Sequence, residues 1–155
     1  MKKPTEGEMV LAVADVAGFT KACQGKSEVE VFATLDQFYG VVDKLVSAAG
    51  GTVVKFMGDS AFVVFPVGKA KEALAALQDL KSTTSDLWVG FGAACHLRVH
   101  AHVGRVASGP LGAEQRFDVV GRAVNDLFRM PWDGPECSEA LRKIDLCDKG
   151  VRLEH

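Results

Sequence analysis

Residues 50–65, GGTVVKFMGDSAFVVF, decide the architecture of this 155-residue chain. Two runs rich in β-branched and aromatic residues, 52–57 and 61–65, flank the sequence Gly58-Asp59-Ser60. Such a sequence is typical of a tight turn between antiparallel strands. We therefore expect a β-hairpin that carries Asp59 at its tip.

The residues before this hairpin predict a strand followed by a long helix. Residues 9–16, MVLAVADV, form an apolar run typical of a buried strand, and Asp15 lies near its end. Ser27 and Glu30 have the spacing of a capping box, and apolar residues then recur with helical period up to residue 49. Gly50-Gly51 ends the predicted helix.

The residues after the hairpin complete an α+β pattern. We expect a helix over 69–81, a break at 82–85, strands at 96–106 and 116–120 with a loop at 109–112, and a helix from residue 121. For residues 87–95 the sequence does not decide between a strand and irregular structure. The order of elements predicts a ferredoxin-like antiparallel sheet with helices packed on it.

Composition excludes several classes of function. With 18 basic and 20 acidic residues the net charge is −2, so we expect no broad positive surface for nucleic acid or an anionic membrane. No apolar stretch approaches the roughly 20 residues of a membrane span. Four scattered cysteines predict a reducing, cytoplasmic location. We interpret 1–152 as a single domain and 153–155, Leu-Glu-His, as the remnant of an affinity tag.

Asp15 and Asp59 are the first candidate site. They stand near the ends of strands that we expect to pair about 4.8 Å apart, so their carboxylates could converge on Mg²⁺ or Mn²⁺. Paired carboxylates of this kind serve two-metal phosphoryl chemistry. Alternatively, Asp15 caps the next segment and Asp59 is an ordinary turn residue, and spacing alone leaves both readings open.

Two further patterns are weaker. Gly25-Lys26-Ser27 imitates the end of a phosphate-binding P-loop, but that motif needs glycine where this chain has Thr20. Ser27 is better interpreted as a helix N-cap and Lys26 as a solvated lysine. Three histidines at 96, 100 and 102 share strand parity, which permits a metal site, although ordinary strand histidines explain them more simply.

Three blocks of sequence resemble the class III nucleotidyl cyclases. They are residues 11–20 (LAVADVAGFT), 50–65, and 99–130, which contains VHAHVGRVASGPLG and RFDVVGRAVNDLFRM, so the resemblance covers about residues 9–130. It implies that Asp15, Asp59 and the carbonyl of Val16 bind two Mg²⁺ or Mn²⁺ ions. It also implies that the backbone near Phe19 and Thr20 surrounds a nucleotide triphosphate.

The same resemblance implies that Lys55 and Asp118 select the base. Lys55 matches a position where adenylate-forming members have lysine and guanylate-forming members have glutamate, and Asp118 matches a position where adenylate cyclases have aspartate or threonine. Adenine offers an acceptor at N1 and a donor at N6, so a donor lysine and an acceptor aspartate complement it. We expect ATP over GTP, and the alternative is a solvated Lys55 paired with a nearby acid.

Asn125 and Arg129 match the family signature V-N-x-x-x-R and share one helical face. In the family the asparagine orients the ribose, and the arginine stabilises charge on the α-phosphate. The family arrangement also implies a homodimer whose two sites each draw residues from both protomers. The family's final strand pair, which supplies a lysine to the phosphates, is compressed here, and Lys149 is the nearest candidate.

These observations predict an adenylate cyclase that converts ATP to 3′,5′-cyclic AMP and pyrophosphate. The alternative is a cyclase-like regulatory or nucleotide-sensing domain that dimerises with little or no catalysis. Guanylate cyclase activity is a third possibility.

Overall fold

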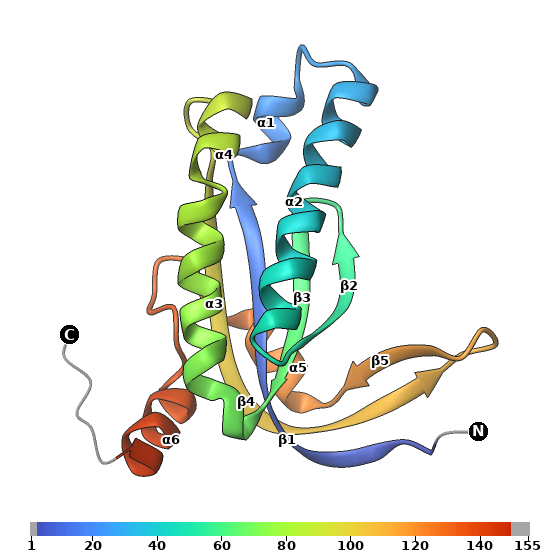
Figure 1. Ribbon diagram of the computed structural model, residues 1–155, viewed down its shortest axis with the longest axis vertical. Helices are drawn as coiled ribbons and strands as arrows, with labels where there is room; N and C mark the ends of the chain where they lie inside the picture. Colours follow the sequence, from blue (N-terminus) through green and yellow to red (C-terminus); the bar gives the residue numbers. More distant parts are fainter. Residues whose placement is uncertain (1–2, 150–155) are drawn as a thin grey trace.

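The computed structural model describes residues 3–149, with side chains up to Ile144. Its described strands form one antiparallel sheet in the order β2-β3-β1-β4-β5 (Figure 1). The strands are β1 (Thr5–Ala17), β2 (Thr52–Met57), β3 (Ser60–Pro66), β4 (His96–Leu111) and β5 (Arg116–Val120). This sheet confirms the predicted α+β fold.

Helices cover both faces of the sheet. The long helices α2 (Glu28–Ala48) and α3 (Ala70–Thr83) lie side by side on one face, and the short α4 (Ser85–Phe91) follows α3 (Figure 1). On the opposite face α5 (Arg122–Arg129) packs against the middle strands. The other helical elements are α1 (Phe19–Cys23), a 3₁₀ turn η1 (Val67–Lys69) and α6 (Glu139–Lys149).

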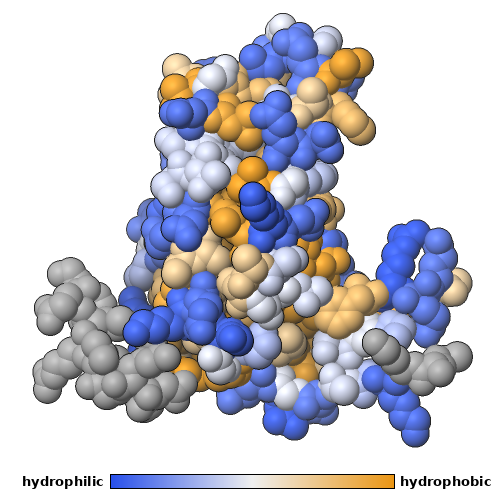
Figure 2. All heavy atoms as spheres, viewed as in Figure 1, coloured by the Kyte–Doolittle hydropathy of each residue, from blue (hydrophilic) through white to orange (hydrophobic). Residues whose placement is uncertain are grey.

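Strand β1 lies at the centre of the core. Its residues Val10, Ala12 and Ala14 face the side of α2 and α3, whereas Leu11 and Val13 face the side of α5, and all five are buried. A strand buried on both faces has a continuous apolar sequence instead of an alternating one, which explains the run at residues 9–16. In Figure 2 hydrophobic residues come to the surface along the seam between α2 and α3.

Local signals at both ends of α2 are confirmed. The Ser27 hydroxyl accepts a hydrogen bond from the Glu30 N–H, and the Glu30 carboxylate accepts one from the Ser27 N–H, each at 3.1 Å. This capping box satisfies backbone donors that have no partner within the helix. After Ala49, Gly50 takes a φ of +83°, a left-handed conformation that favours glycine and ends the helix.

The expectations for residues 87–95 and for the loop at 109–112 were wrong in part. Residues 85–91 form helix α4, because Trp88 and Phe91, three residues apart, bury one helical face in the core. Most of the expected loop belongs to β4, which runs to Leu111 and pairs Pro110 with Phe117. Pro110 is tolerated because it lies beyond the last pair with β1, where β4 has a neighbour on one side only.

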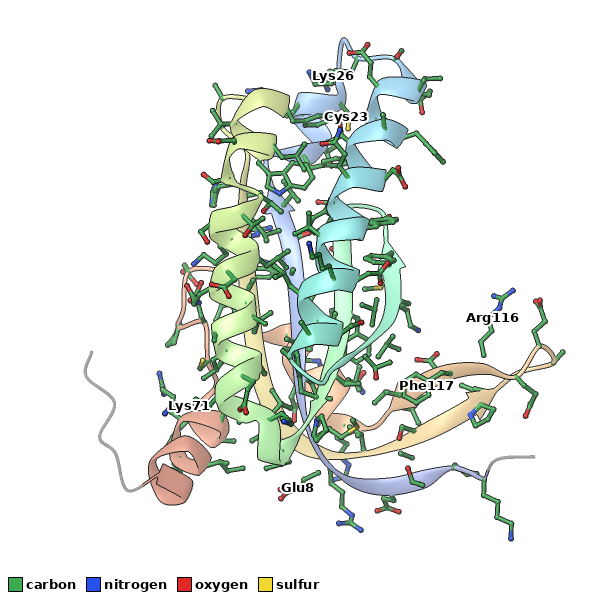
Figure 3. All side chains as sticks on the ribbon, viewed as in Figure 1. Glu8, Cys23, Lys26, Lys71, Arg116 and Phe117 are labelled. Carbon is green, nitrogen blue, oxygen red and sulfur yellow. The ribbon has the colours of Figure 1, made fainter. Side chains whose placement is uncertain are left out.

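The ends of β4 and β5 form an arm that projects from the body of the protein. Figure 3 shows Arg116 and Phe117 on this arm, away from α2 and α3. Phe117 is 42% exposed, and Leu111 and Val120 on the same arm are also exposed. Among the described helices, none combines the length and apolar character needed to cross a membrane.

Candidate active site

Asp15 and Asp59 come together where the ends of β1 and the β2–β3 hairpin meet. Asp15 pairs in register with Ser60, the residue directly after Asp59. Partial burial and then the negative charge of Asp15 raise the pKa of Asp59, so the two carboxylates lie close enough to repel each other. The hairpin turn also brings the Asp59 carboxylate to the backbone N–H of Val16. The structure thus brings the two aspartates to the same end of the sheet.

Helix α2 braces the turn that carries Asp59. Gly58 adopts a φ of +61° in this turn, and its carbonyl accepts a hydrogen bond of 2.6 Å from the hydroxyl of Tyr39. The Tyr39 ring stacks on Phe56 with 3.8 Å between ring centroids. The sequence does not identify Tyr39 as a site residue, because its position on the helix does not reveal which turn it reaches.

Arg98 is a second site residue that the sequence does not identify. It faces Asp15 across β1 and β4, and its Nε and Nη2 donate hydrogen bonds of 3.0 and 2.8 Å to Oδ2 of Asp15. The other oxygen, Oδ1, accepts a hydrogen bond of 2.8 Å from the Ser60 hydroxyl. Both oxygens of Asp15 are therefore engaged in hydrogen bonds. The Asp15 side chain is only 17% exposed, so this site is half-buried.

The donor set of these two aspartates fits a hard divalent cation. Mg²⁺ takes oxygen ligands and is commonly bound by one or two carboxylates, with waters and substrate phosphates completing the shell. The mutual repulsion of the aspartates is the charge pattern that a cation relieves. Among the described side chains, no three His, Cys, Asp or Glu residues gather as a metal site of their own, so any ion here depends on backbone, water or substrate oxygens.

The histidines do not form the alternative metal site. The ring of His100 is buried and stacks on Trp132, and Nδ1 of His102 is 2.7 Å from the Ser138 hydroxyl. Burial is the main reason why the pKa values of both histidines are lowered. They pack the face of β4 next to the segment that follows α5.

Lys55 and Asp118 form an ion pair, with 3.0 Å between Nζ and Oδ2. The other oxygen of Asp118 accepts a hydrogen bond of 2.7 Å from the Val119 N–H. Partial burial opposes ionisation, but this hydrogen bond and the Lys55 ammonium together lower the pKa of Asp118. A charged donor and a charged acceptor are thus held side by side.

The remaining predicted residues lie at separate places. Asn125 and Arg129 are exposed on one face of α5, whereas Ala123 and Leu127 bury the other. Thr20 is exposed on α1, and the Phe19 ring stacks on Phe91 with 5.3 Å between centroids. Val16 is buried at the end of β1. Lys149 ends α6, and its side chain lies outside the described residues.

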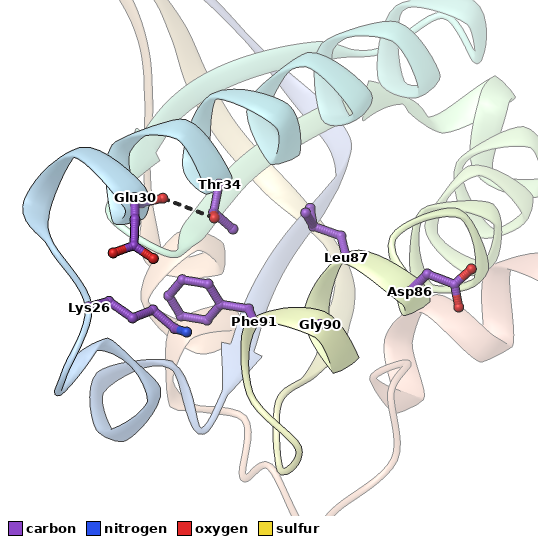
Figure 4. Close-up of a pocket in the computed structure, with 7 residues that line it drawn as sticks. All are labelled: Lys26, Glu30, Thr34, Asp86, Leu87, Gly90 and Phe91. Carbon is purple, nitrogen blue, oxygen red and sulfur yellow. Dashed lines mark hydrogen bonds between the residues drawn. The ribbon is translucent and has the colours of Figure 1, made fainter.

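A cavity of about 330 Å³ between the start of α2 and α4 is distinct from this site (Figure 4). It contains none of the predicted site residues. The ammonium of Lys26 lies 4.8 Å from the centroid of the Phe91 ring, so Lys26 is half-buried against an aromatic face and is not the solvated lysine that the sequence suggested. The cavity is lined by Lys26, Glu30, Thr34, Asp86, Leu87, Gly90 and Phe91.

Comparison with known proteins identifies relatives over most of the chain. A profile described as the adenylate and guanylate cyclase catalytic domain matches residues 1–137. Adenylate cyclase 1 of Rhizobium meliloti (strain 1021) is 28% identical over 134 residues, which cover 79% of this chain and 20% of that protein. The chain therefore spans about a fifth of the length of this relative.

Solved structures share the fold at low sequence identity. The adenylyl cyclase CyaB from P. aeruginosa has a TM-score of 0.82 at 20% identity, covering 96% of this chain and 84% of that chain. A dimeric guanylyl cyclase domain of the RhoGC fusion protein from the aquatic fungus Blastocladiella emersonii has a TM-score of 0.82 at 21% identity, covering 96% and 88%. Proteins named adenylyl cyclase and proteins named guanylyl cyclase share this architecture, so the structural similarity does not distinguish adenine from guanine.

Proposed function

The chain belongs to the family of adenylate and guanylate cyclase catalytic domains, and on that premise we propose that it converts ATP to 3′,5′-cyclic AMP and pyrophosphate. The observation that carries this proposal is the ion pair between Lys55 and Asp118. It holds the hydrogen-bond donor and the acceptor that the edge of adenine requires.

The choice of ATP over GTP follows from the polarity of this pair. Adenine presents an acceptor at N1 and a donor at N6, which match the Lys55 ammonium and the Asp118 carboxylate. Guanine presents the reverse pattern at these positions and would set donor against donor and acceptor against acceptor. The lowered pKa of Asp118 keeps its carboxylate ionised, and thus an acceptor, at neutral pH.

Asp15, Asp59 and the carbonyl of Val16 are the groups that would hold the divalent cations. Two Mg²⁺ or Mn²⁺ ions at this position supply activation of the ribose 3′-hydroxyl and neutralisation of phosphate charge. The chain orients these ligands in advance: the Ser60 hydroxyl fixes Asp15, and the Tyr39 hydroxyl fixes the turn before Asp59.

Asn125 and Arg129 would act on the ribose and the α-phosphate. Both are exposed on the same face of α5, so a nucleotide can reach them. A preorganised donor aimed at developing charge contributes about 3–4 kcal/mol to lowering the barrier. The backbone near Phe19 and Thr20 is the proposed contact for the triphosphate, and Lys149 is a further candidate for its distal phosphates.

A homodimer would assemble the complete site. In the described part of the chain, no hydrogen bond or ion pair joins Asp15 or Asp59 to Lys55, Asp118 or Arg129. Bulky apolar side chains on the arm and α5 are exposed: Phe117 by 42%, Val120 by 50% and Phe128 by 46%. A second copy would cover these side chains, and its twofold axis would create two equivalent sites.

We place this reaction in the cytoplasm. ATP and reducing conditions are both found there, and neither Cys23 nor Cys95 is in a disulfide.

A second candidate function is a nucleotide-sensing domain that dimerises with little catalysis. The observation that favours it is the engagement of Asp15 by Arg98, because the guanidinium competes with a cation for the same oxygen. The two candidates differ in turnover and not in fold.

Product formation separates them. Purified protein is incubated with ATP and Mn²⁺, and cyclic AMP is measured by mass spectrometry beside Asp59→Ala and Asp36→Ala. Asp36 is an exposed acid on α2 and serves as the matched control. We expect cyclic AMP from the wild type and Asp36→Ala only, whereas equal traces from wild type and Asp59→Ala would favour the sensing domain. A higher rate with GTP than with ATP would instead identify a guanylate cyclase.

A further inference from the structure

Arg98 is held from two sides. Its guanidinium makes the two hydrogen bonds to Asp15, and its Cζ atom lies 4.3 Å from the centroid of the Trp132 ring. The Trp132 ring in turn stacks on His100, with 3.9 Å between centroids and 9° between the ring planes. Successive side chains of a strand point to opposite faces, so residues 98 and 100, two apart on β4, face the same side of the sheet. Trp132 lies across both.

The segment that carries Trp132 is fixed to β4. The Ala101 N–H donates to the Glu136 carbonyl at 2.8 Å, and the Ser138 N–H donates back to the Ala101 carbonyl at 2.9 Å. The hydrogen bond between His102 and Ser138 adds a third attachment. Trp132 is therefore held in place, although the residue is 38% exposed.

These contacts define what Arg98 does at Asp15. Both donors of the guanidinium converge on one oxygen of the carboxylate, and such charge-assisted hydrogen bonds are stronger than neutral ones. Stacking on an aromatic ring orients the guanidinium further. Any cation that binds Oδ2 of Asp15 must first displace the two Arg98 donors from it. Affinity for the cation thus depends on how firmly Arg98 is held.

We propose that Arg98 is a resident counter-ion of Asp15 and that Trp132 is the positioning residue that keeps it there, so that the pair sets the affinity of the site for divalent cations. This inference rests on the proposed use of Asp15 and Asp59 as cation ligands. It assigns a role to the segment between α5 and α6, which holds none of the predicted site residues.

The direct test is Mn²⁺ binding to the protein without nucleotide, measured from the electron paramagnetic resonance signal of free Mn²⁺. Arg98→Met removes the competing donors, and we expect it to bind Mn²⁺ about tenfold more tightly. Trp132→Leu leaves the net charge unchanged and removes only the aromatic support, and we expect binding that is about two- to fivefold tighter. Trp132→Phe keeps a ring over Arg98 and should restore the wild-type affinity.

Arg105→Met is the matched charge control. Arg105 lies on the same strand, is 65% exposed and pairs with Glu6 at 2.7 Å, away from Asp15. We expect its Mn²⁺ affinity to equal that of the wild type. Circular dichroism and the melting temperature of each variant confirm that the affinities belong to folded protein.

Tryptophan fluorescence distinguishes the proposed role of Trp132 from a purely structural one. Adding Mg²⁺ should change the emission of Trp132, because Arg98 leaves its pairing with Asp15, and the change should be absent in Arg98→Met. The other tryptophan, Trp88, is fully buried. The emission of the Trp132→Leu variant measures the constant contribution of Trp88.

The outcomes separate this inference from the proposed function. If wild type and an Asp15→Asn/Asp59→Asn double variant bind Mn²⁺ equally weakly, the proposed cation site itself fails. If the double variant loses Mn²⁺ binding while Arg98→Met and Trp132→Leu keep the wild-type affinity, the cation site stands and the counter-ion role is overturned.

Discussion

The Lys55 ammonium and the Asp118 carboxylate lie 3.0 Å apart, although their strands, β2 and β5, are the two outer strands of the sheet. The ion pair therefore joins two strands that are not hydrogen-bonded neighbours in the sheet. One hydrogen-bond donor and one acceptor are thereby fixed as a unit. The identity of either residue should therefore control which base the site accepts.

Lys55→Glu is expected to lower kcat/KM for ATP by about 10- to 100-fold, because a carboxylate cannot donate to adenine N1 and because it repels Asp118. The kcat/KM for GTP should fall less or rise, so the ratio of kcat/KM for ATP to kcat/KM for GTP decreases. Steady-state rates with both nucleotides measure this ratio. Lys44→Glu makes the same charge change at an exposed position of α2 and should leave the ratio unaltered.

Local features of the fold could be predicted from the sequence, because their signals lie within a few residues of each other. The capping box at Ser27, the left-handed Gly50 and the hairpin tip at Asp59 are examples. The meeting of Asp15 and Asp59 followed from one correct strand pairing. Helix α4 was obscured by Gly90 and Gly92, which weaken the helical pattern although the burial of Trp88 stabilises the helix.

Contacts that depend on register and sheet curvature could not be predicted. Arg98 meets Asp15 only because β1 and β4 pair in one particular register. Trp132 reaches Arg98 through a segment anchored at Ala101, and Tyr39 reaches Gly58 from a different element. In each case the partners are far apart in the chain, so neither residue type nor spacing identifies them.

Asp59→Asn should separate stability from activity. Burial and the charge of Asp15 raise the pKa of Asp59, so its ionised form destabilises the folded protein at neutral pH. The amide removes this repulsion, and we expect the melting temperature in the presence of EDTA to rise by about 2–4 °C. Cyclic AMP formation should fall at least about 100-fold. A variant that melts lower than wild type while keeping its activity would contradict this assignment.

The contribution of His100 and His102 to stability should decrease as the pH falls below about 6.5. Burial lowers the pKa values of His100 and His102 below 6.5, so the unfolded chain binds more protons than the folded protein once the pH falls below that value. The free energy of unfolding then decreases by at most about 1.4 kcal/mol per pH unit for each histidine, and it levels off below their folded-state pKa values.

Urea denaturation at pH 7.5, 6.5 and 5.5 measures this dependence. His102→Gln can keep a hydrogen bond to Ser138 without titrating, so its stability should change less with pH than that of the wild type. His96 is exposed on the same strand, and His96→Gln should retain the full wild-type dependence. Equal slopes for all three proteins would assign the pH dependence to other groups.

Two inactive variants should restore activity when mixed, if each site draws residues from two protomers. Asp59→Asn lacks a proposed cation ligand and Arg129→Ala lacks a proposed catalytic donor, so each homodimer has two defective sites. Random exchange makes half of the dimers mixed, and each mixed dimer has one site with both changes and one site with neither. Cyclic AMP formation should therefore recover to about a quarter of the wild-type rate. A mixture that stays as inactive as its components, in protein shown to be dimeric and exchanging, would mean that each site is built within a single chain.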